Sequence, residues 1–119
     1  MHGLMIGVSG MRGTVGASLT PDVVVRMAAA FARWLVETRA AGASGPLRVV
    51  IGRDPRPSGP FVQDAAMAAL HASGVQLIDL DVVTTPTTAI MVRHLAADGG
   101  IVATASHNPI AWNGLKFLS

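Results

Sequence analysis

The stretch that decides the fold class is Leu47-Arg48-Val49-Val50-Ile51-Gly52. It is short and rich in β-branched residues, and it follows the breaker cluster 41–46, so it predicts a buried strand that ends at Gly52. The alanine-rich stretch after it predicts a helix over 58–71, which closes at Ser73-Gly74, where glycine can adopt the left-handed conformation. A strand followed by such a helix favours parallel pairing with the next strand through a right-handed crossover.

The alternation of strand and helix continues on both sides of this unit. Thr20-Pro21-Asp22 combines an N-cap residue, a first-turn proline and a carboxylate at the positive end of the helix dipole, so it predicts a helix start. An apolar stripe at helical spacing follows it. The expected helices cover 21–41, 58–71 and 85–97, and Asp98-Gly99-Gly100 is expected to end the last of them. The expected strands cover 47–51, 75–83 and 101–104, with an extended segment over 114–118 and a glycine-rich turn between two short strands within 7–16.

This order predicts an α/β fold. We expect a three-layer α/β/α sandwich with a mostly parallel, mixed sheet of about four core strands and a short N-terminal hairpin. The length of 119 residues fits one compact domain over residues 1–119. A hydrophobic fraction of 50% and a charged fraction of 13% argue against intrinsic disorder, because disordered chains are polar and highly charged.

Composition also excludes several functional classes. With no cysteine, the chain has no disulfide framework, thiolate nucleophile or Cys-ligated metal. Arginines interrupt the longest apolar runs, so no membrane span is expected, and the N-terminus does not resemble a signal peptide, which makes a cytoplasmic location the default expectation. The net charge is only +2 and the arginines are scattered, so nucleic acid is not an expected partner.

Polar residues gather after the strand expected over 101–104, in Thr104-Ala105-Ser106-His107-Asn108-Pro109. Parallel sheets bind ligands beyond the carboxyl ends of their strands. Ser106 is therefore a candidate nucleophile or phosphate carrier, although Asn-Pro and Ser/Thr clusters also mark ordinary turns. A serine hydrolase is disfavoured, because no Gly-x-Ser-x-Gly elbow surrounds Ser106 and His107 is its direct neighbour in the chain.

A second candidate loop, 52–59, joins a strand end to a helix start. Arg53 and Arg56 could hold an anion there, together with free N–H groups of the helix. The alternative is structural: Asp54 pairs with Arg53 or Arg56, and Ser58 caps the helix.

Other polar residues give weaker signals. Asp79 and Asp81 share one face of an expected strand and could bind a divalent cation, but two carboxylates without a third ligand nearby more often mark a solvated strand end. His71 and His94 lie near the carboxyl ends of expected helices, which suits a structural role. Lys116 lies on the segment that leaves the Ser106 loop and could return toward that site.

Four motifs stand in order along nearly the whole chain: Ser9-Gly10-Met11-Arg12-Gly13, Gly52-Arg53-Asp54-Pro55-Arg56-Pro57-Ser58, Thr104-Ala105-Ser106-His107-Asn108-Pro109 and Asn113-Gly114-Leu115-Lys116-Phe117. Together they resemble the N-terminal domain of the α-D-phosphohexomutases, which include phosphoglucomutase, phosphomannomutase and phosphoglucosamine mutase. Four motifs in the family's order are far more specific than any one of them.

The resemblance implies that Ser106 is a phosphoserine. It lends its phosphoryl group to a hexose monophosphate and recovers one from the bisphosphate after that sugar turns around. The implied catalytic residues are Ser106, His107, Arg12 and Lys116, with the last two supplying charge stabilisation and proton transfer, as phosphoryl transfer requires. The implied supports of the loop and the phosphate environment are Ser9, Thr104, Asn108, Asn113, Gly114, Arg53, Asp54 and Arg56, and His107 also supports the loop.

The resemblance also implies ligands and partners. In the family, Mg²⁺ is held by a metal loop and touches this domain only through the phosphoryl group of Ser106, and a hexose 1,6-bisphosphate is activator and intermediate. The implied partners are a hexose or hexosamine phosphate and the other mutase domains. The chain contains no Asp-Gly-Asp-x-Asp-Arg metal loop, no Gly-Glu-x-Ser-Gly-His sugar loop and no C-terminal phosphate-binding loop. Weak metal binding and incomplete turnover by this chain alone are therefore expected.

Asp81 departs from the family pattern, because relatives commonly have glycine there, and this leaves the local turn geometry open. Two alternatives to a catalytic domain also remain. One is a sugar-phosphate-binding module without turnover, and the other is an excised or engineered α/β folding unit. The apolar excess predicts self-association through an exposed interdomain face.

Overall fold

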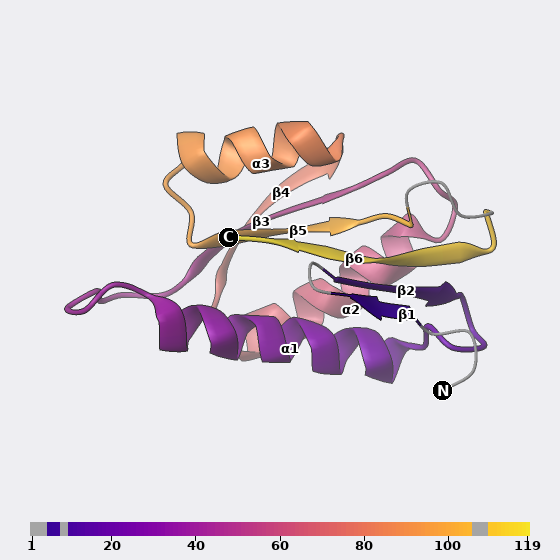
Figure 1. Ribbon diagram of the computed structural model, residues 1–119, viewed down its shortest axis with the longest axis horizontal. Helices are drawn as coiled ribbons and strands as arrows, with labels where there is room; N and C mark the ends of the chain where they lie inside the picture. Colours follow the sequence, from indigo (N-terminus) through magenta and orange to yellow (C-terminus); the bar gives the residue numbers. More distant parts are fainter. Residues whose placement is uncertain (1–4, 8–9, 106–109) are drawn as a thin grey trace.

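The computed structural model describes residues 5–7, 10–105 and 110–119. These residues fold into helices and strands whose order along the chain agrees with the predicted alternation (Figure 1). The elements are β1 (Met5–Gly7), β2 (Gly10–Thr14), α1 (Pro21–Thr38), β3 (Arg48–Arg53), α2 (Gly59–Ala72), β4 (Gln76–Val82), α3 (Thr85–His94), β5 (Gly99–Ala103) and β6 (Trp112–Leu118).

The strands form one mixed sheet in the order β1-β2-β6-β5-β3-β4. β3 lies between β4 and β5 and is parallel to both, as crossover connections through helices require. β6 runs antiparallel to β5, β2 antiparallel to β6, and β1 antiparallel to β2. The predicted N-terminal hairpin is therefore not an appendage, because β2 extends the sheet by pairing along its full length with β6.

Helices cover both faces of this sheet. α1 and α2 pack side by side on one face, and α3 lies on the other face over β3 and β5 (Figure 1). This arrangement confirms the predicted three-layer α/β/α sandwich.

The first helix begins where the sequence predicts. The Thr20 hydroxyl donates a 2.5 Å hydrogen bond to Asp22 Oδ1, and this bond lowers the pKa of the Asp22 carboxyl below its usual 3.8. The Thr20 side chain itself does not cap a backbone N–H. The helix ends at Thr38, before the predicted residue 41, and the Arg39 guanidinium there donates to the Gly45 carbonyl at 3.1 Å.

The main core lies between the sheet and the α1–α2 layer. Phe31 of α1 stacks on Phe117 of β6 with ring centroids 4.8 Å apart, so the aromatic pair joins the helix layer to the antiparallel half of the sheet. The largest fully buried apolar side chains of this core include Leu19, Ile51, Leu70, Ile101 and Leu115.

Gly99 and Gly100 do not end the third helix as expected. α3 stops at His94, and both glycines belong to the fully buried strand β5. A Cβ on Gly99 would lie 2.8 Å from the Leu118 carbonyl oxygen, and one on Gly100 would lie 2.8 Å from Val92 Cγ2. The missing side chains let β6 and α3 approach β5 closely, which is a packing requirement that local sequence signals do not reveal.

Strand β4 carries an irregularity at Asp81. Its pairing with β3 shifts register so that Ile51 faces Asp79 and Gly52 faces Asp81, with one extra residue between. Asp81 has φ of 61°, a conformation that non-glycine residues other than asparagine and aspartate rarely adopt. The bulge supplies the turn geometry that the sequence left open, and aspartate is among the few side chains that tolerate it.

Within the ranges that the structure describes, none of the helices has the length and apolar character needed to cross a membrane.

Candidate functional site

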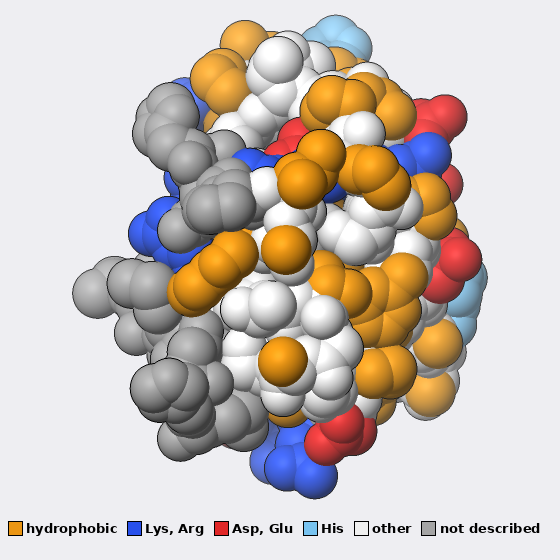
Figure 2. Space-filling model, turned by 90° about the vertical axis from the view of Figure 1, so that its right-hand side faces the viewer, with side chains coloured by type: hydrophobic (Ala, Val, Ile, Leu, Met, Phe, Trp, Pro, Cys, Tyr) orange, Lys and Arg blue, Asp and Glu red, His pale blue; other side chains and the backbone are white. Residues whose placement is uncertain are grey.

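The parallel strands β3, β4 and β5 all end at the same edge of the sheet, on the right of Figure 1. Figure 2 shows this end of the molecule, where hydrophobic side chains and side chains of both charges are interspersed. Asp54, Pro55, Arg56 and Ile110 line an open depression of about 300 Å³ there. The polar residues of this edge converge as expected for a ligand site of an α/β sheet.

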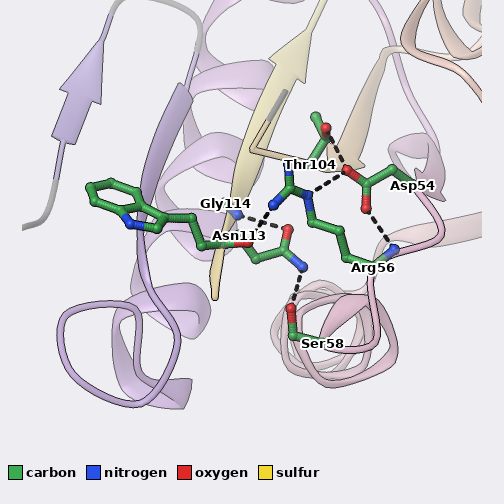
Figure 3. A network of polar contacts seen from close by, with 7 residues as sticks. Asp54, Arg56, Ser58, Thr104, Asn113 and Gly114 are labelled. Carbon is green, nitrogen blue, oxygen red and sulfur yellow. Dashed lines mark hydrogen bonds and ion pairs between the residues drawn. The ribbon is translucent and has the colours of Figure 1, made fainter. Parts of the chain in front are cut away.

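Asp54 is the centre of a polar network that joins the two candidate loops (Figure 3). Its Oδ2 accepts hydrogen bonds from Thr104 Oγ1 at 2.8 Å and from Arg56 Nε at 3.1 Å, and its Oδ1 accepts from the Arg56 backbone N–H at 3.1 Å. Both partners of the Asp54–Arg56 ion pair are largely buried, with side-chain exposures of 22% and 11%. The pair is therefore better shielded from solvent than a surface ion pair.

The second part of the network connects the start of β6 to α2. The Arg56 guanidinium donates to the Trp112 carbonyl oxygen at 3.1 Å. The fully buried Asn113 side chain donates to Ser58 Oγ at 2.8 Å and accepts from the Gly114 N–H at 2.8 Å. The expectation that Ser58 caps the helix is wrong, because its side chain makes no cap hydrogen bond and serves Asn113 as an acceptor.

The chain on both sides of residues 106–109 is fastened to the sheet. The Thr104 N–H donates to the Gly114 carbonyl oxygen at 3.0 Å, and Ala105 is buried. On the far side, the Ala111 carbonyl oxygen accepts from the Val15 N–H at 2.9 Å. Hydrogen bonds to β6 and to Val15, the residue after β2, thus fix the points at which the chain leaves and rejoins the sheet.

Four of the predicted site residues lie outside the described ranges: Ser9, Ser106, His107 and Asn108.

Arg12 and Lys116 come together on one face of the sheet. In the β2–β6 ladder, Gly10 pairs with Lys116 and Arg12 pairs with Gly114. Because directly opposite residues of antiparallel strands point to the same face, Arg12 and Lys116 are diagonal neighbours, a relation in which residues lie roughly 7–8 Å apart. Their face is the one that α1 and α2 do not cover.

Gly114 lets β2 and β6 approach closely beside these two cations. A Cβ on Gly114 would lie 2.1 Å from the Met11 carbonyl oxygen and 2.7 Å from Arg12 Cα. No side chain fits there without separating β2 from β6. Glycine at this position keeps the strands in register and adds no side chain to the surface between Arg12 and Lys116.

Arg53 does not pair with Asp54. Its guanidinium pairs instead with Asp81 of the β4 bulge, with Arg53 Nη2 and Asp81 Oδ1 2.7 Å apart, and it donates to the buried Gln63 of α2. Asp79 accepts from Gln63 Nε2 at 2.7 Å. The two strand carboxylates are thus engaged by protein groups, and no group of three acidic or histidine residues is found in the described part of the chain.

Sequence reasoning missed one residue of this site, Gln63, and one contact between residues that it did name, Asn113 and Ser58. Gln63 is a lone amide on the buried face of a helix rich in alanine, and that exception to the apolar pattern could have marked it as a partner of a polar loop. The contact of Asn113 with Ser58 joins residues 55 positions apart, and no local pattern could have found it.

Comparison with known proteins agrees with the motif pattern. Residues 3–119 match the family described as phosphoglucomutase/phosphomannomutase, alpha/beta/alpha domain I. The chain is 42% identical over 115 residues to the phosphoglucosamine mutase of Acidothermus cellulolyticus, covering 97% of this chain and 25% of the relative. It is 39% identical over 117 residues to that of Moorella thermoacetica, covering 98% of this chain and 25% of the relative.

The fold is similar to the crystal structure of a Thermus thermophilus protein described as a phosphomannomutase, with a TM-score of 0.84 and 33% identity, over 98% of this chain and 26% of that chain. The chain thus spans about a quarter of the length of these relatives. Fold, motif order and sequence identity agree. The chain belongs to the phosphoglucomutase/phosphomannomutase family of phosphohexomutases, in which it corresponds to the N-terminal domain I.

Proposed function

We propose that this chain is the phosphoserine-carrying domain of a phosphohexomutase. In this proposal Ser106 holds the phosphoryl group that moves between C1 and C6 of a hexose or hexosamine phosphate by way of a bisphosphate. The domain supplies the phosphoryl carrier, and complete turnover requires the other domains of the family.

The placement of Arg12 and Lys116 carries the proposal. They share one sheet face on β2 and β6, and β6 lies beside β5, the strand that leads through Thr104 toward Ser106. Two cations on rigid strands next to a strand end suit a phosphoryl group, because catalysis of its transfer depends on positioning and charge stabilisation. The Asp54 network supports the same strand end through Thr104.

The proposed step conserves atoms and charge. A sugar hydroxyl oxygen attacks the phosphorus of phosphoserine, a P–O bond to the sugar forms, and the P–Oγ bond to Ser106 breaks. The hydroxyl proton leaves the sugar, and Ser106 Oγ ends the step as a protonated hydroxyl. We assign charge stabilisation to Arg12, proton transfer to Lys116, and support of the loop to His107 and Asn108. The reverse step returns a phosphoryl group from the bisphosphate to Ser106.

Mg²⁺ and a hexose 1,6-bisphosphate belong to this proposal as cofactor and intermediate. The described residues do not by themselves fit a magnesium site, because they hold no group of three acidic or histidine side chains and the Asp54 carboxylate already accepts three hydrogen bonds. The ion would reach this domain through the phosphoryl oxygens of Ser106, where it would add charge neutralisation. Its remaining ligands would come from another domain.

The test is phosphorylation of the protein itself. The chain is incubated with Mg²⁺ and a hexose 1,6-bisphosphate and analysed by intact-mass spectrometry and peptide mapping, alone and with the remaining domains of a relative added as a separate chain. Ser106→Ala is the key variant, and Ser44→Ala, an exposed serine in the α1–β3 loop, is the matched control. We expect one phosphoryl group at Ser106 in the wild type and in Ser44→Ala, and none in Ser106→Ala.

Two results would contradict the proposal. One is the absence of phosphorylation in both settings, and the other is phosphorylation that survives Ser106→Ala at another residue. Sugar-phosphate binding without any phosphoprotein would instead identify a binding module.

A further inference from the structure

The β4 bulge holds a charged residue in an unfavourable backbone conformation. Asp81 has φ of 61° and is followed by the exposed Val82 at the end of an edge strand. Residues other than glycine in this region store backbone strain, and such strain persists where surrounding contacts impose it. The contacts of the Asp81 carboxylate should therefore account for this backbone conformation.

Those contacts form a closed cluster around Arg53. Its Nη2 lies 2.7 Å from Asp81 Oδ1, and its Nη1 donates to Gln63. Gln63 in turn donates to Asp79 Oδ1 at 2.7 Å, and the same Asp79 oxygen accepts the Asp81 N–H at 2.8 Å. One guanidinium is thus held from two sides, by the bulge of β4 and by α2.

The cluster is directly connected to the candidate site. Arg53 precedes Asp54, whose N–H donates to the Ala103 carbonyl oxygen at 3.0 Å. The Arg53 side chain also packs on the start of α2, where a Cβ on Gly59 would lie 2.9 Å from Arg53 Cδ. Arg53 thus lies against both ends of the 54–58 loop, through its peptide bond to Asp54 and through its side chain at Gly59.

A contribution to global stability does not explain why aspartate stands at position 81. Its side chain is 71% exposed, and ion pairs with so exposed a partner contribute little to folding. Glycine would adopt the same φ without steric cost. The carboxylate brings a local benefit instead, since it fixes the direction of the Arg53 side chain.

We propose that Asp81 is a positioning residue. Through Arg53 it holds the 54–58 loop, and with it the polar network around Asp54, against the strand end that leads to Ser106. Its catalytic consequence rests on the proposed function. Its structural part, the restraint of the loop, can be tested without it.

Three variants distinguish the effect of the Asp81 carboxylate from the effect of its backbone conformation. Asp81→Asn keeps a side chain that tolerates positive φ and removes the charge, and Asp81→Gly removes the charge together with the strain. Asp64→Asn, an exposed carboxylate on α2, is the matched control. Each is compared with the wild type by thermal unfolding, by hydrogen exchange of the backbone amides at positions 54 and 56, and by the rate of Ser106 phosphorylation from a hexose 1,6-bisphosphate.

We expect both Asp81 variants to exchange these amides faster and to phosphorylate Ser106 roughly two- to fivefold more slowly, the range that a weak ion pair supports. Asp81→Gly should unfold at the same or a higher temperature than the wild type, which a merely stabilising residue would not do. Asp64→Asn should match the wild type in every measurement.

The proposal is overturned if amide exchange at positions 54 and 56 is unchanged in both Asp81 variants, or if faster exchange simply follows a lower unfolding temperature. If wild-type Ser106 is never phosphorylated, the proposed function fails, and the exchange data still decide whether Asp81 restrains the loop.

Discussion

Replacing Asp54 by asparagine should separate the two candidate loops while leaving the shape of the side chain unchanged. The Asp54 carboxylate accepts hydrogen bonds on both oxygens, from Thr104 Oγ1 and Arg56 Nε on one and from the Arg56 N–H on the other. An amide has one oxygen, so its NH₂ group must face a donor on one of the two sides. The substitution therefore removes the charge of a largely buried ion pair and at least one hydrogen bond.

The size of the loss follows from the burial of the pair. Hydrogen bonds to charged groups contribute about 1.5–3 kcal/mol, and breaking a fully buried ion pair costs about 3–5 kcal/mol. With side-chain exposures of 22% for Asp54 and 11% for Arg56, and with the Arg56 bond to the Trp112 carbonyl retained, we expect Asp54→Asn to lower the free energy of unfolding by about 2–4 kcal/mol.

Urea unfolding followed by circular dichroism measures this loss. Asp64→Asn serves as the exposed control and should stay within about 0.5 kcal/mol of the wild type. Combining Asp54→Asn with Thr104→Val in a double-mutant cycle should give a coupling energy of about 0.5–3 kcal/mol. Additive effects of the two substitutions would refute the argument that Asp54 is the centre of the polar network. A loss of stability for Asp54→Asn no larger than that of the control would refute it too.

Three further predictions concern the sheet, the first helix and the surface. Gly114→Ala should lower the free energy of unfolding by about 3 kcal/mol or more, because its Cβ would lie 2.1 Å from the Met11 carbonyl oxygen; an unchanged urea midpoint would show that β2 and β6 can separate freely. The Thr20 hydrogen bond lowers the pKa of Asp22, so the stability that this carboxylate contributes is present above its unfolded-state pKa and is lost as pH falls through its folded-state pKa. Asp22→Asn should therefore be less stable than the wild type at neutral pH, and the gap between their urea midpoints should close in acid; a gap that persists in acid contradicts this. Exposed apolar side chains such as Trp34 should promote self-association at high protein concentration, and sedimentation velocity that stays monomeric at every concentration would argue against it.

Local sequence patterns predicted the elements well and their ends less well. The β-branched run before Gly52 and the Thr20-Pro21 start are signals that a few neighbouring residues generate, and both elements are present. Their ends differ from the prediction, because β3 extends to Arg53 and α1 stops at Thr38. The end of α3 was misplaced because Gly99 and Gly100 were interpreted as a helix stop, whereas they serve contacts with other elements of the sandwich. From the sequence alone, a glycine that ends a helix cannot be distinguished from a glycine that permits close packing.

The candidate site, too, was predictable from the sequence only in part. Motif order along the chain was enough to indicate the family, and the family match bears out the resemblance. The roles that the resemblance implies for Arg12, Arg56 and Lys116 stay predictions. The direction of Arg53 toward Asp81 rather than Asp54 was not predictable, because it depends on a register shift between two strands.

By itself, the sequence determined the alternation of strands and helices, the α/β/α class and the four motifs, since each depends on residues close together in the chain. Only the tertiary structure decided that β6 lies antiparallel between β5 and β2, that this placement brings Lys116 beside Arg12, and that Asn113 meets Ser58. The physical reason is that strand order and side-chain pairing arise from contacts between residues distant in the chain, and burial of the common core selects among the arrangements that local preferences allow.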